Sequence, residues 1–259
     1  MTAHTFFTLA TGFYFLSLAA AFLPKGTRSA MWGFLAAALF ANATAAAMRY
    51  WTAWPMLPMY LGPQALPLCL AMLLVLNRRN ARELWLRRLI PGFALLLCIL
   101  ALLFPKDFYL PFLKSNAAFA HAFFVFGMIG KGCFLVSAAW ALTALFASAG
   151  AENTGNARTG EVSAQRPWLR WAVWGFAFWT LSMFAGELWT YFGWGTPVVW
   201  DDPAITTTMA TWFFYICLLH LHLTGSWSAR GRTAFAAGGA VVVLALNFIP
   251  ELGPFRWPF

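Results

Sequence analysis

Charged residues are scarce in this sequence, and acidic residues are the scarcest. Only 10% of the 259 residues are charged, with 8 Asp and Glu against 17 Lys and Arg, while 61% are hydrophobic and the mean hydropathy is +0.68. A soluble domain carries about 25% charged residues, so this composition excludes an ordinary soluble fold and indicates an integral membrane protein. No basic cluster lies outside a short connection between apolar runs, which excludes a nucleic-acid-binding surface.

Cysteine is also rare, and its spacing excludes several kinds of site. Cys69, Cys98, Cys133 and Cys217 each stand alone in an apolar run, without the paired spacing of a zinc or redox site, so we expect small core residues. The sequence has no Cys-x-x-Cys-His motif and is therefore not itself a c-type cytochrome. It also has no Ser/His/Asp order, phosphate-binding loop or metalloprotease motif.

Long apolar runs are abundant and predict the fold. Because a helix needs about 20 mostly apolar residues to cross a bilayer, we predict an all-α polytopic membrane bundle of about eight transmembrane helices. The predicted spans are 5–23, 30–48, 60–77, 90–104, 117–147, 168–191, 205–224 and 233–249. The first run has neither a preceding basic region nor a small-residue cleavage site, so we expect a helix and not a signal peptide. Residues 149–165, rich in Gly, Ala, Asn and Thr, are expected to form a mobile linker.

The basic residues predict the orientation, because Lys and Arg favour the cytoplasmic side in short loops. With the N-terminus outside, twelve of the 17 basic residues lie inside, and only Arg49, Lys106, Lys114 and Arg256 lie outside. This distribution predicts a multi-pass protein of the inner (cytoplasmic) membrane. The outward segments are then 49–59, 105–116, 192–204 and 250–259.

Residues 186–203, which we call the tryptophan-rich segment, lie at the predicted outer end of the sixth helix. The segment contains Trp189, Trp194 and Trp200 together with close-set glycines and two adjacent aspartates. One interpretation is an aromatic belt at the membrane interface. A belt needs neither the glycines nor the aspartates, whereas glycines let the backbone approach a flat ligand. The pattern therefore favours a ligand-binding platform.

Histidine occurs only as His4, His121, His220 and His222, and ionisable residues inside a membrane are candidates for function. A lone histidine is also often a satisfied core residue. His121 lies about two turns inside the outer interface, whereas His220 lies roughly 22 Å deeper than the outer end of its helix, so the two are not expected to share a metal. His222 is about 200° around the helix from His220 and is expected to be a bystander.

Four basic residues near or within the predicted spans can be interpreted either as ordinary membrane-protein charges or as functional groups. Arg49, Lys114 and Arg256 are either ordinary interfacial charges or partners for the carboxylates of a porphyrin, whose iron a neutral imidazole would bind. Lys131 falls within the fifth predicted span and is expected to snorkel toward the inner face.

These residues resemble the membrane haem-handling proteins of cytochrome c assembly, the CcsA, CcmC and CcmF group. Two stretches, 113–121 and 212–220, are most similar to CcsA. The resemblance covers about residues 105–255, while the first four spans match only in general hydropathy. The shared pattern Gly-x-x-Trp-x-x-x-x-Trp-Gly-x-x-x-x-Trp-Asp is met by Gly186, Trp189, Trp194, Gly195, Trp200 and Asp201.

The resemblance implies the haem-handling component of a cytochrome c synthase (haem lyase), with transmembrane helices in 1–104 and haem-handling helices in 105–259. The tryptophan-rich segment would be a platform for transiently bound haem b at the outer face. His121 would be an external axial ligand, and His220 would belong to an inner haem site or entry route. The implied partners are haem, a CcsB-type membrane protein of system II, and an apocytochrome c with a Cys-x-x-Cys-His motif.

One departure from the family changes the expected ligand set. Pro254 stands where the family places a second external histidine. A second axial ligand is therefore expected from His4, from a partner protein or from the apocytochrome. Whether the chain alone is an enzyme stays open.

Two other functions stay open as well. A membrane b-type cytochrome would pass electrons and would need paired ligands at matching depths, which His121 and His220 do not offer. A transporter of haem or another solute would be expected to show paired broken spans in two related halves, and the sequence has no such repeat.

Overall fold

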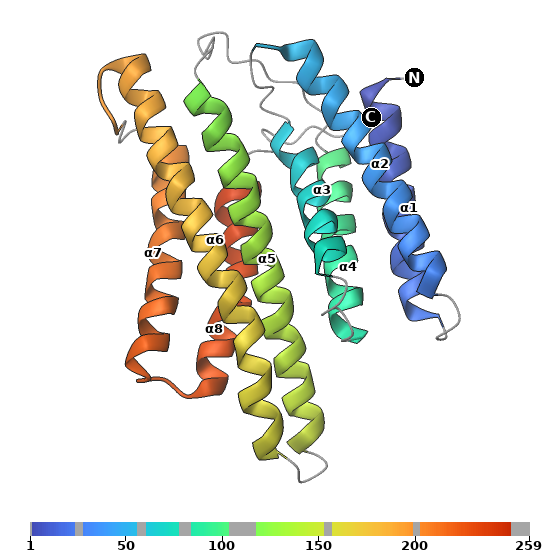
Figure 1. Ribbon diagram of the computed structural model, residues 1–259, viewed down its shortest axis with the longest axis vertical. Coiled ribbons are helices and arrows are strands. Elements are labelled where there is room, and N and C mark those ends of the chain that lie inside the picture. Colours follow the sequence, from blue (N-terminus) through green and yellow to red (C-terminus); the bar gives the residue numbers. More distant parts are fainter. Residues whose placement is uncertain are drawn as a thin grey trace. The chain divides into compact units, whose positions relative to one another are not determined.

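The computed structural model describes residues 2–23, 28–55, 61–77, 84–103, 118–152, 157–198 and 203–249, and all regular structure in these ranges is helical. This finding confirms the predicted all-α fold and the predicted number of helices (Figure 1). The helices are α1 (Ala3–Phe22), α2 (Arg28–Ala53), α3 (Leu61–Leu76), α4 (Leu84–Leu103), α5 (Ala118–Glu152), α6 (Ala157–Trp194), α7 (Pro203–Thr224), α8 (Ala229–Val243) and the π-helix η2 (Leu244–Phe248).

Five of the described helices are long and apolar enough to cross a membrane, and the chain is a membrane protein. They are α1, α2, α4, α5 and the continuous α8–η2 helix. Helix α3 is apolar but has only 16 residues. Helices α6 and α7 have 38 and 22 residues but are not among the five.

The helical ends around residues 149–165 differ from the prediction. Helix α5 continues to Glu152 and α6 already begins at Ala157, so most of the predicted mobile linker is helical and only residues 153–156 lie outside the described ranges. Composition suggested a linker, but Ala, Glu, Gln and Arg are strong helix formers and extend the two helices beyond their apolar parts.

The chain forms two compact units, which are described separately. Unit 1 comprises Met1–His121 and Phe248–Phe259, and unit 2 comprises Ala122–Asn247. In unit 1, α1 packs against α2 and α4, while α3 packs against α2 and α4. In unit 2, α6, α7 and α8 pack against one another. The functional division between residues 104 and 105 stays a prediction.

Small residues and internally satisfied polar groups hold unit 1 together. Ala38 and Ala45 of α2 are fully buried, which lets neighbouring helices approach closely. The Tyr14 hydroxyl donates to the Pro67 carbonyl oxygen at 3.4 Å and accepts from the Asn42 amide, also at 3.4 Å. Such bonds stabilise polar groups in a bilayer, where water does not compete.

A seam of glycines and serines joins α5 to α6 in unit 2. A Cβ added at Gly175 would lie 2.5 Å from Cδ1 of Phe134, and one added at Gly186 would lie 3.0 Å from Cδ2 of Phe123. Near the same end, the Ser182 hydroxyl donates to the Phe123 carbonyl oxygen at 2.7 Å. Small residues of this kind allow close packing of membrane helices, and they fix α6 against α5.

Two indole hydrogen bonds connect α6 to α7. Trp179 Nε1 donates to the Thr208 carbonyl oxygen at 3.1 Å, and Trp212 Nε1 donates to the Thr180 hydroxyl at 3.0 Å. Because each helix contributes a donor to the other, the register between them is fixed. This pairing positions the histidines farther along α7.

Candidate functional site

His121 lies in the first turn of α5 and packs in unit 1 against two aromatic residues, Tyr50 in the last turn of α2 and Trp54 directly after it. Its Nδ1 lies 3.1 Å from the Tyr50 hydroxyl oxygen, within hydrogen-bond distance. The Trp54 ring lies 5.4 Å from the imidazole, centroid to centroid, at an interplanar angle of 31°, and the Tyr50 ring lies 5.8 Å away at 70°. We call Tyr50, Trp54 and His121 the histidine cluster.

The histidine cluster includes residues that the sequence analysis missed. Tyr50 and Trp54 are one helical turn apart, and the Trp54 backbone N–H donates to the Tyr50 carbonyl oxygen at 3.0 Å. Their i, i+4 spacing at the start of an outward segment was visible in the sequence. It was not used because the resemblance began at about residue 105. When Nδ1 of a histidine is hydrogen-bonded, Nε2 is the nitrogen available to a metal.

The tryptophan-rich segment begins in the last turns of α6 and continues beyond the helix through a turn at Gly195. Gly195 has φ +72°, and its N–H donates to the Tyr191 carbonyl oxygen at 2.9 Å, which ends the helix with a residue in the left-handed region. The buried Thr190 hydroxyl lies 2.6 Å from the Pro197 carbonyl oxygen and 2.9 Å from that of Glu187. These bonds hold the start of the segment against the last turn of α6.

Two further residues of the family pattern lie against α5. Gly186 faces Phe123 in the seam, and the half-buried Trp189 ring stacks near the same phenylalanine, with centroids 6.3 Å apart and an interplanar angle of 29°. The side chain of Trp194 and all of Trp200 and Asp201 lie outside the described residues. Their assignment to a platform stays a prediction.

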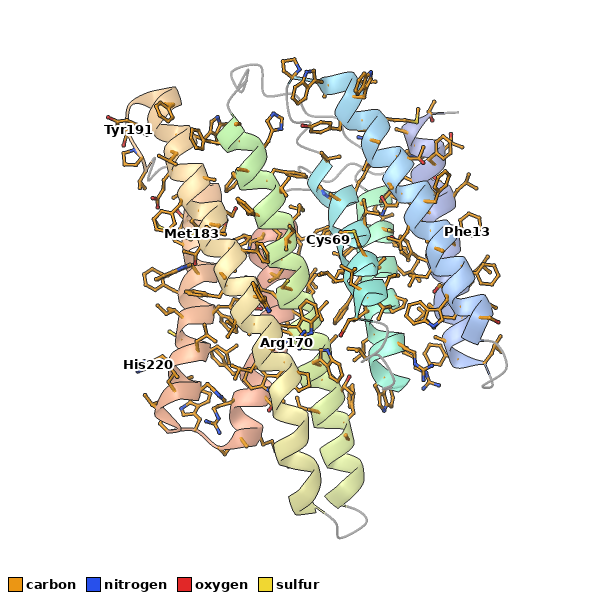
Figure 2. The ribbon with its side chains drawn as sticks, in the orientation of Figure 1. Phe13, Cys69, Arg170, Met183, Tyr191 and His220 are labelled. Atoms are coloured by element: carbon orange, nitrogen blue, oxygen red, sulfur yellow. The ribbon has the colours of Figure 1, made fainter. Side chains whose placement is uncertain are left out.

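His220 lies on an exposed face of α7. The exposed residues Phe213, Cys217 and Leu223 recur on this helix at spacings of about one turn. Within unit 2, Figure 2 shows Tyr191 and His220 toward opposite ends, which agrees with the expectation that His220 lies far from the outer end of its helix. Cys217 is exposed, so its prediction as a core residue is wrong, whereas Cys69, Cys98 and Cys133 are buried.

The other two histidines have different surroundings. The His222 ring is half-buried beside Trp168, at a centroid distance of 6.1 Å and an angle of 84°. His4 is exposed in the first turn of α1. Among the described residues, no group of three or more His, Cys, Asp or Glu side chains is arranged to hold a metal ion.

Lys131 is buried, and the predicted snorkelling is wrong. It is 5% exposed and donates from Nζ to the Asn247 carbonyl oxygen in η2 at 3.2 Å. The Asn247 amide in turn donates to the Thr211 hydroxyl at 2.6 Å, and Lys131 Nζ lies 5.9 Å from the centroid of the Trp179 ring. Unit 2 thus satisfies this charge internally through backbone and aromatic contacts.

Of the three cations considered for porphyrin carboxylates, the structure describes one. Arg49 lies on α2 directly before Tyr50 and is half-buried. Lys114 and Arg256 lie outside the described residues. Arg49 is therefore adjacent in sequence to Tyr50 of the histidine cluster, and its assignment to a porphyrin carboxylate stays a prediction.

Comparison with known proteins decides the family. A family model described as cytochrome C assembly protein matches residues 3–253. The chain belongs to the cytochrome c assembly protein family. The family match confirms the resemblance found in the sequence and extends it to α1–α4, and the matched range includes Tyr50 and Trp54 of the histidine cluster.

Relatives of this cytochrome c assembly protein include several named cytochrome c biogenesis protein CcsA. The protein of Prochlorococcus marinus (strain MIT 9312) is 35% identical over 90 residues, covering 33% of this chain and 29% of that protein. The protein of Guillardia theta is 36% identical over 88 residues, covering 32% of this chain and 29% of that protein. The match thus spans less than a third of the length of either relative.

A solved structure shares the fold of this family member. The structure named Cytochrome c Heme Lyase CcmF aligns with a TM-score of 0.72 at 17% sequence identity, covering 100% of this chain and 48% of the other. At that identity the likeness concerns the fold. The helical arrangement of a cytochrome c assembly protein therefore agrees with that of one half of the CcmF chain.

Proposed function

We propose that this cytochrome c assembly protein holds haem at the outer face of the cytoplasmic membrane and presents it to an apocytochrome c. The observation that carries the proposal is the setting of His121, whose Nδ1 is already within hydrogen-bond distance of Tyr50. Histidines that bind metals almost always have the second ring nitrogen hydrogen-bonded, which fixes the tautomer and the ring orientation. Family membership supports the same function.

In the proposed mechanism the chain binds and orients haem b, while the haem vinyl groups and the two thiols of the apocytochrome Cys-x-x-Cys-His motif supply the bond-forming chemistry. His121 would hold the haem iron through a neutral imidazole. By resemblance, Trp189, Trp194 and Trp200 would provide flat surfaces that exclude water from the porphyrin. Arg49 is the described cation assigned to a propionate.

The second axial ligand at the outer face is proposed to come from outside the family's usual position. Pro254 occupies that position in the sequence and has no side chain that can bind iron. His4 belongs to the same unit as His121 and is exposed. A partner protein and the apocytochrome histidine are the other sources.

His220 is proposed to serve an inner haem site together with a partner. An ionisable side chain on an exposed apolar helix face is costly in lipid, and a covering protein removes that cost. The CcsB-type partner is the proposed cover. In this scheme His220 is an iron ligand at a haem site that the partner completes, because the His220 side chain is exposed on the surface of unit 2.

The proposal is tested by separate histidine variants expressed in cells without another cytochrome c assembly system. We expect His121→Ala to abolish cytochrome c maturation and to lower haem recovered with the protein by about tenfold or more, as loss of ligand-shell groups does. Insertion should be normal, because truncating a half-buried imidazole leaves a hole rather than an uncompensated charge. Acid acetone should extract all bound haem, since the chain has no thioether anchor.

The matched control is His222→Ala, which removes an imidazole that packs beside Trp168 in unit 2. This variant should mature cytochromes normally. Added imidazole should restore part of the His121→Ala defect by occupying the vacant iron position. Normal maturation by His121→Ala together with failure of His4→Ala would show that the axial ligand is misassigned, and the absence of haem uptake by the purified wild-type protein would contradict the function itself.

A further inference from the structure

The histidine cluster contains a hydrogen bond whose partner lies on a helix distant in sequence. We propose that Tyr50 is the positioning residue of His121: its phenolic oxygen accepts a hydrogen bond from Nδ1–H, so that Nε2 keeps its lone pair for iron. This inference rests on the proposed function, because it concerns the haem ligand assigned there. It adds α2, which the sequence resemblance did not reach, to the outer haem site.

The geometry restrains the imidazole through one hydrogen bond and two ring contacts. The oxygen–nitrogen distance of 3.1 Å holds the Nδ1 edge, and the near-perpendicular Tyr50 ring, at 70°, keeps the phenol beside that edge. The Trp54 ring packs beside the imidazole, with centroids 5.4 Å apart and an interplanar angle of 31°. Tyr50 and Trp54 also contact each other, with ring centroids 5.6 Å apart, so rotation of His121 would displace both rings.

The direction of the hydrogen bond follows from the chemistry of ligation. The Tyr50 hydroxyl can either donate to or accept from Nδ1 in the free protein, because the two neutral tautomers of histidine differ in which nitrogen carries the proton. With Nε2 as the iron ligand, the proton would stay on Nδ1, and the phenolic oxygen would accept a hydrogen bond from Nδ1–H. An acceptor at this position makes the imidazole a stronger electron donor and favours ferric over ferrous iron.

Tyr50→Phe removes this acceptor and keeps the ring that packs against His121 and Trp54. The purified full-length variant should bind added iron protoporphyrin IX about tenfold more weakly than the wild type, as expected for loss of an outer-shell partner. Its haem midpoint potential should shift in the positive direction. Trp54→Leu should weaken binding without this shift, since it removes packing and leaves the hydrogen bond.

Tyr14→Phe is the matched control, because it removes a hydrogen-bonded hydroxyl from unit 1 away from the histidine cluster. It should change neither haem affinity nor potential, although it lowers stability. In a double-mutant cycle, Tyr50→Phe should add nothing to His121→Ala, because the first residue acts through the second.

The outcomes separate this inference from the proposed function. If His121→Ala loses haem while Tyr50→Phe binds it with unchanged affinity and potential, Tyr50 is not a positioning residue and the proposed function stands. If His121→Ala binds haem normally, the ligand assignment and this inference both fail. If Tyr50→Phe does not fold, Trp54→Leu tests the inference instead. A positive shift of its haem midpoint potential would contradict the assignment of the potential to the Tyr50 hydrogen bond.

Discussion

At the scale of single residues, Gly195 determines how the tryptophan-rich segment leaves α6. The residue adopts φ +72°, which glycine reaches without steric cost and other L-residues reach at a cost. Its N–H donates to the Tyr191 carbonyl oxygen and ends the helix, and the Thr190 hydroxyl donates to the Pro197 carbonyl oxygen beside the same turn. The glycine after the tryptophan in the family pattern therefore has a conformational reason in this chain.

Gly195→Ala should destabilise this turn by about 1 kcal/mol, the cost of placing a side chain in the left-handed region. The expected result is a lower midpoint of thermal unfolding in detergent and faster proteolysis within residues 195–198. Gly193→Ala is the control, because a Cβ there has no heavy atom within 4 Å and the residue lies inside α6. Equal stability of the two variants would argue against a role for the Gly195 conformation.

Sequence patterns predicted which residue types carry function but not which faces they occupy. Lys131 was expected to snorkel and is buried, and Cys217 was expected in the core and is exposed. In soluble helices a polar face marks the outside, but in a membrane helix both faces are apolar and the contrast disappears. Tyr50 was missed for a different reason: it lies before residue 105, where the resemblance began, and its partner His121 is 71 positions away in the chain.

At the scale of helices, α5 and α6 depend on close approach at glycines. Gly175 meets the Phe134 ring, and Gly186 meets Phe123 near the end that carries Trp189. Lipid provides no hydrophobic force to push membrane helices together, so packing of small residues and interhelical hydrogen bonds must do so. The placement of Trp189 thus depends on the seam.

Gly175→Ala should destabilise unit 2, because its Cβ would lie 2.5 Å from Phe134 Cδ1. Overpacking of this kind typically costs about 1–3 kcal/mol. We expect the variant to have a lower midpoint temperature of thermal denaturation, measured as the fraction of protein that stays monodisperse after heating in detergent. Gly238→Ala in α8 is the control: a Cβ there meets nothing within 4 Å, and alanine favours helix over glycine. The idea of a tight seam fails if Gly175→Ala is as stable as Gly238→Ala.

The number of helices was predictable from hydropathy, whereas several helical ends were not. Apolar length is a sufficient criterion for a membrane helix, and all eight predicted spans overlap a described helix. Helix α6 nevertheless starts 11 residues before its predicted span at 168, because helix-forming residues continue it past the apolar part. Hydropathy identifies the part of a helix that lies in lipid. The backbone hydrogen bonds continue beyond that part, so hydropathy does not give the helical ends.

At the scale of the whole molecule, function depends on which ends of the helices face outward. The basic residues favour an outward N-terminus, with twelve of 17 on the cytoplasmic side. This orientation would place residues 192–204 outside and the connection between α7 and α8 inside. It also requires α7 to cross the membrane, although α7 is not one of the five described helices that are long and apolar enough to do so by length and composition alone.

Cysteine labelling across α7 tests this orientation. In a background with Cys217→Ala, which removes the exposed native thiol, Thr196→Cys and Ser226→Cys each introduce a thiol at an exposed position on either side of α7. A membrane-impermeant maleimide applied to intact spheroplasts should modify position 196, and it should modify position 226 only after permeabilisation. The reverse pattern would invert the topology and move the tryptophan-rich segment to the cytoplasm, where it could not present haem to an exported apocytochrome. Labelling of both positions from one side would mean that α7 does not span the bilayer, and His220 would then lose its assignment to an intramembrane haem site.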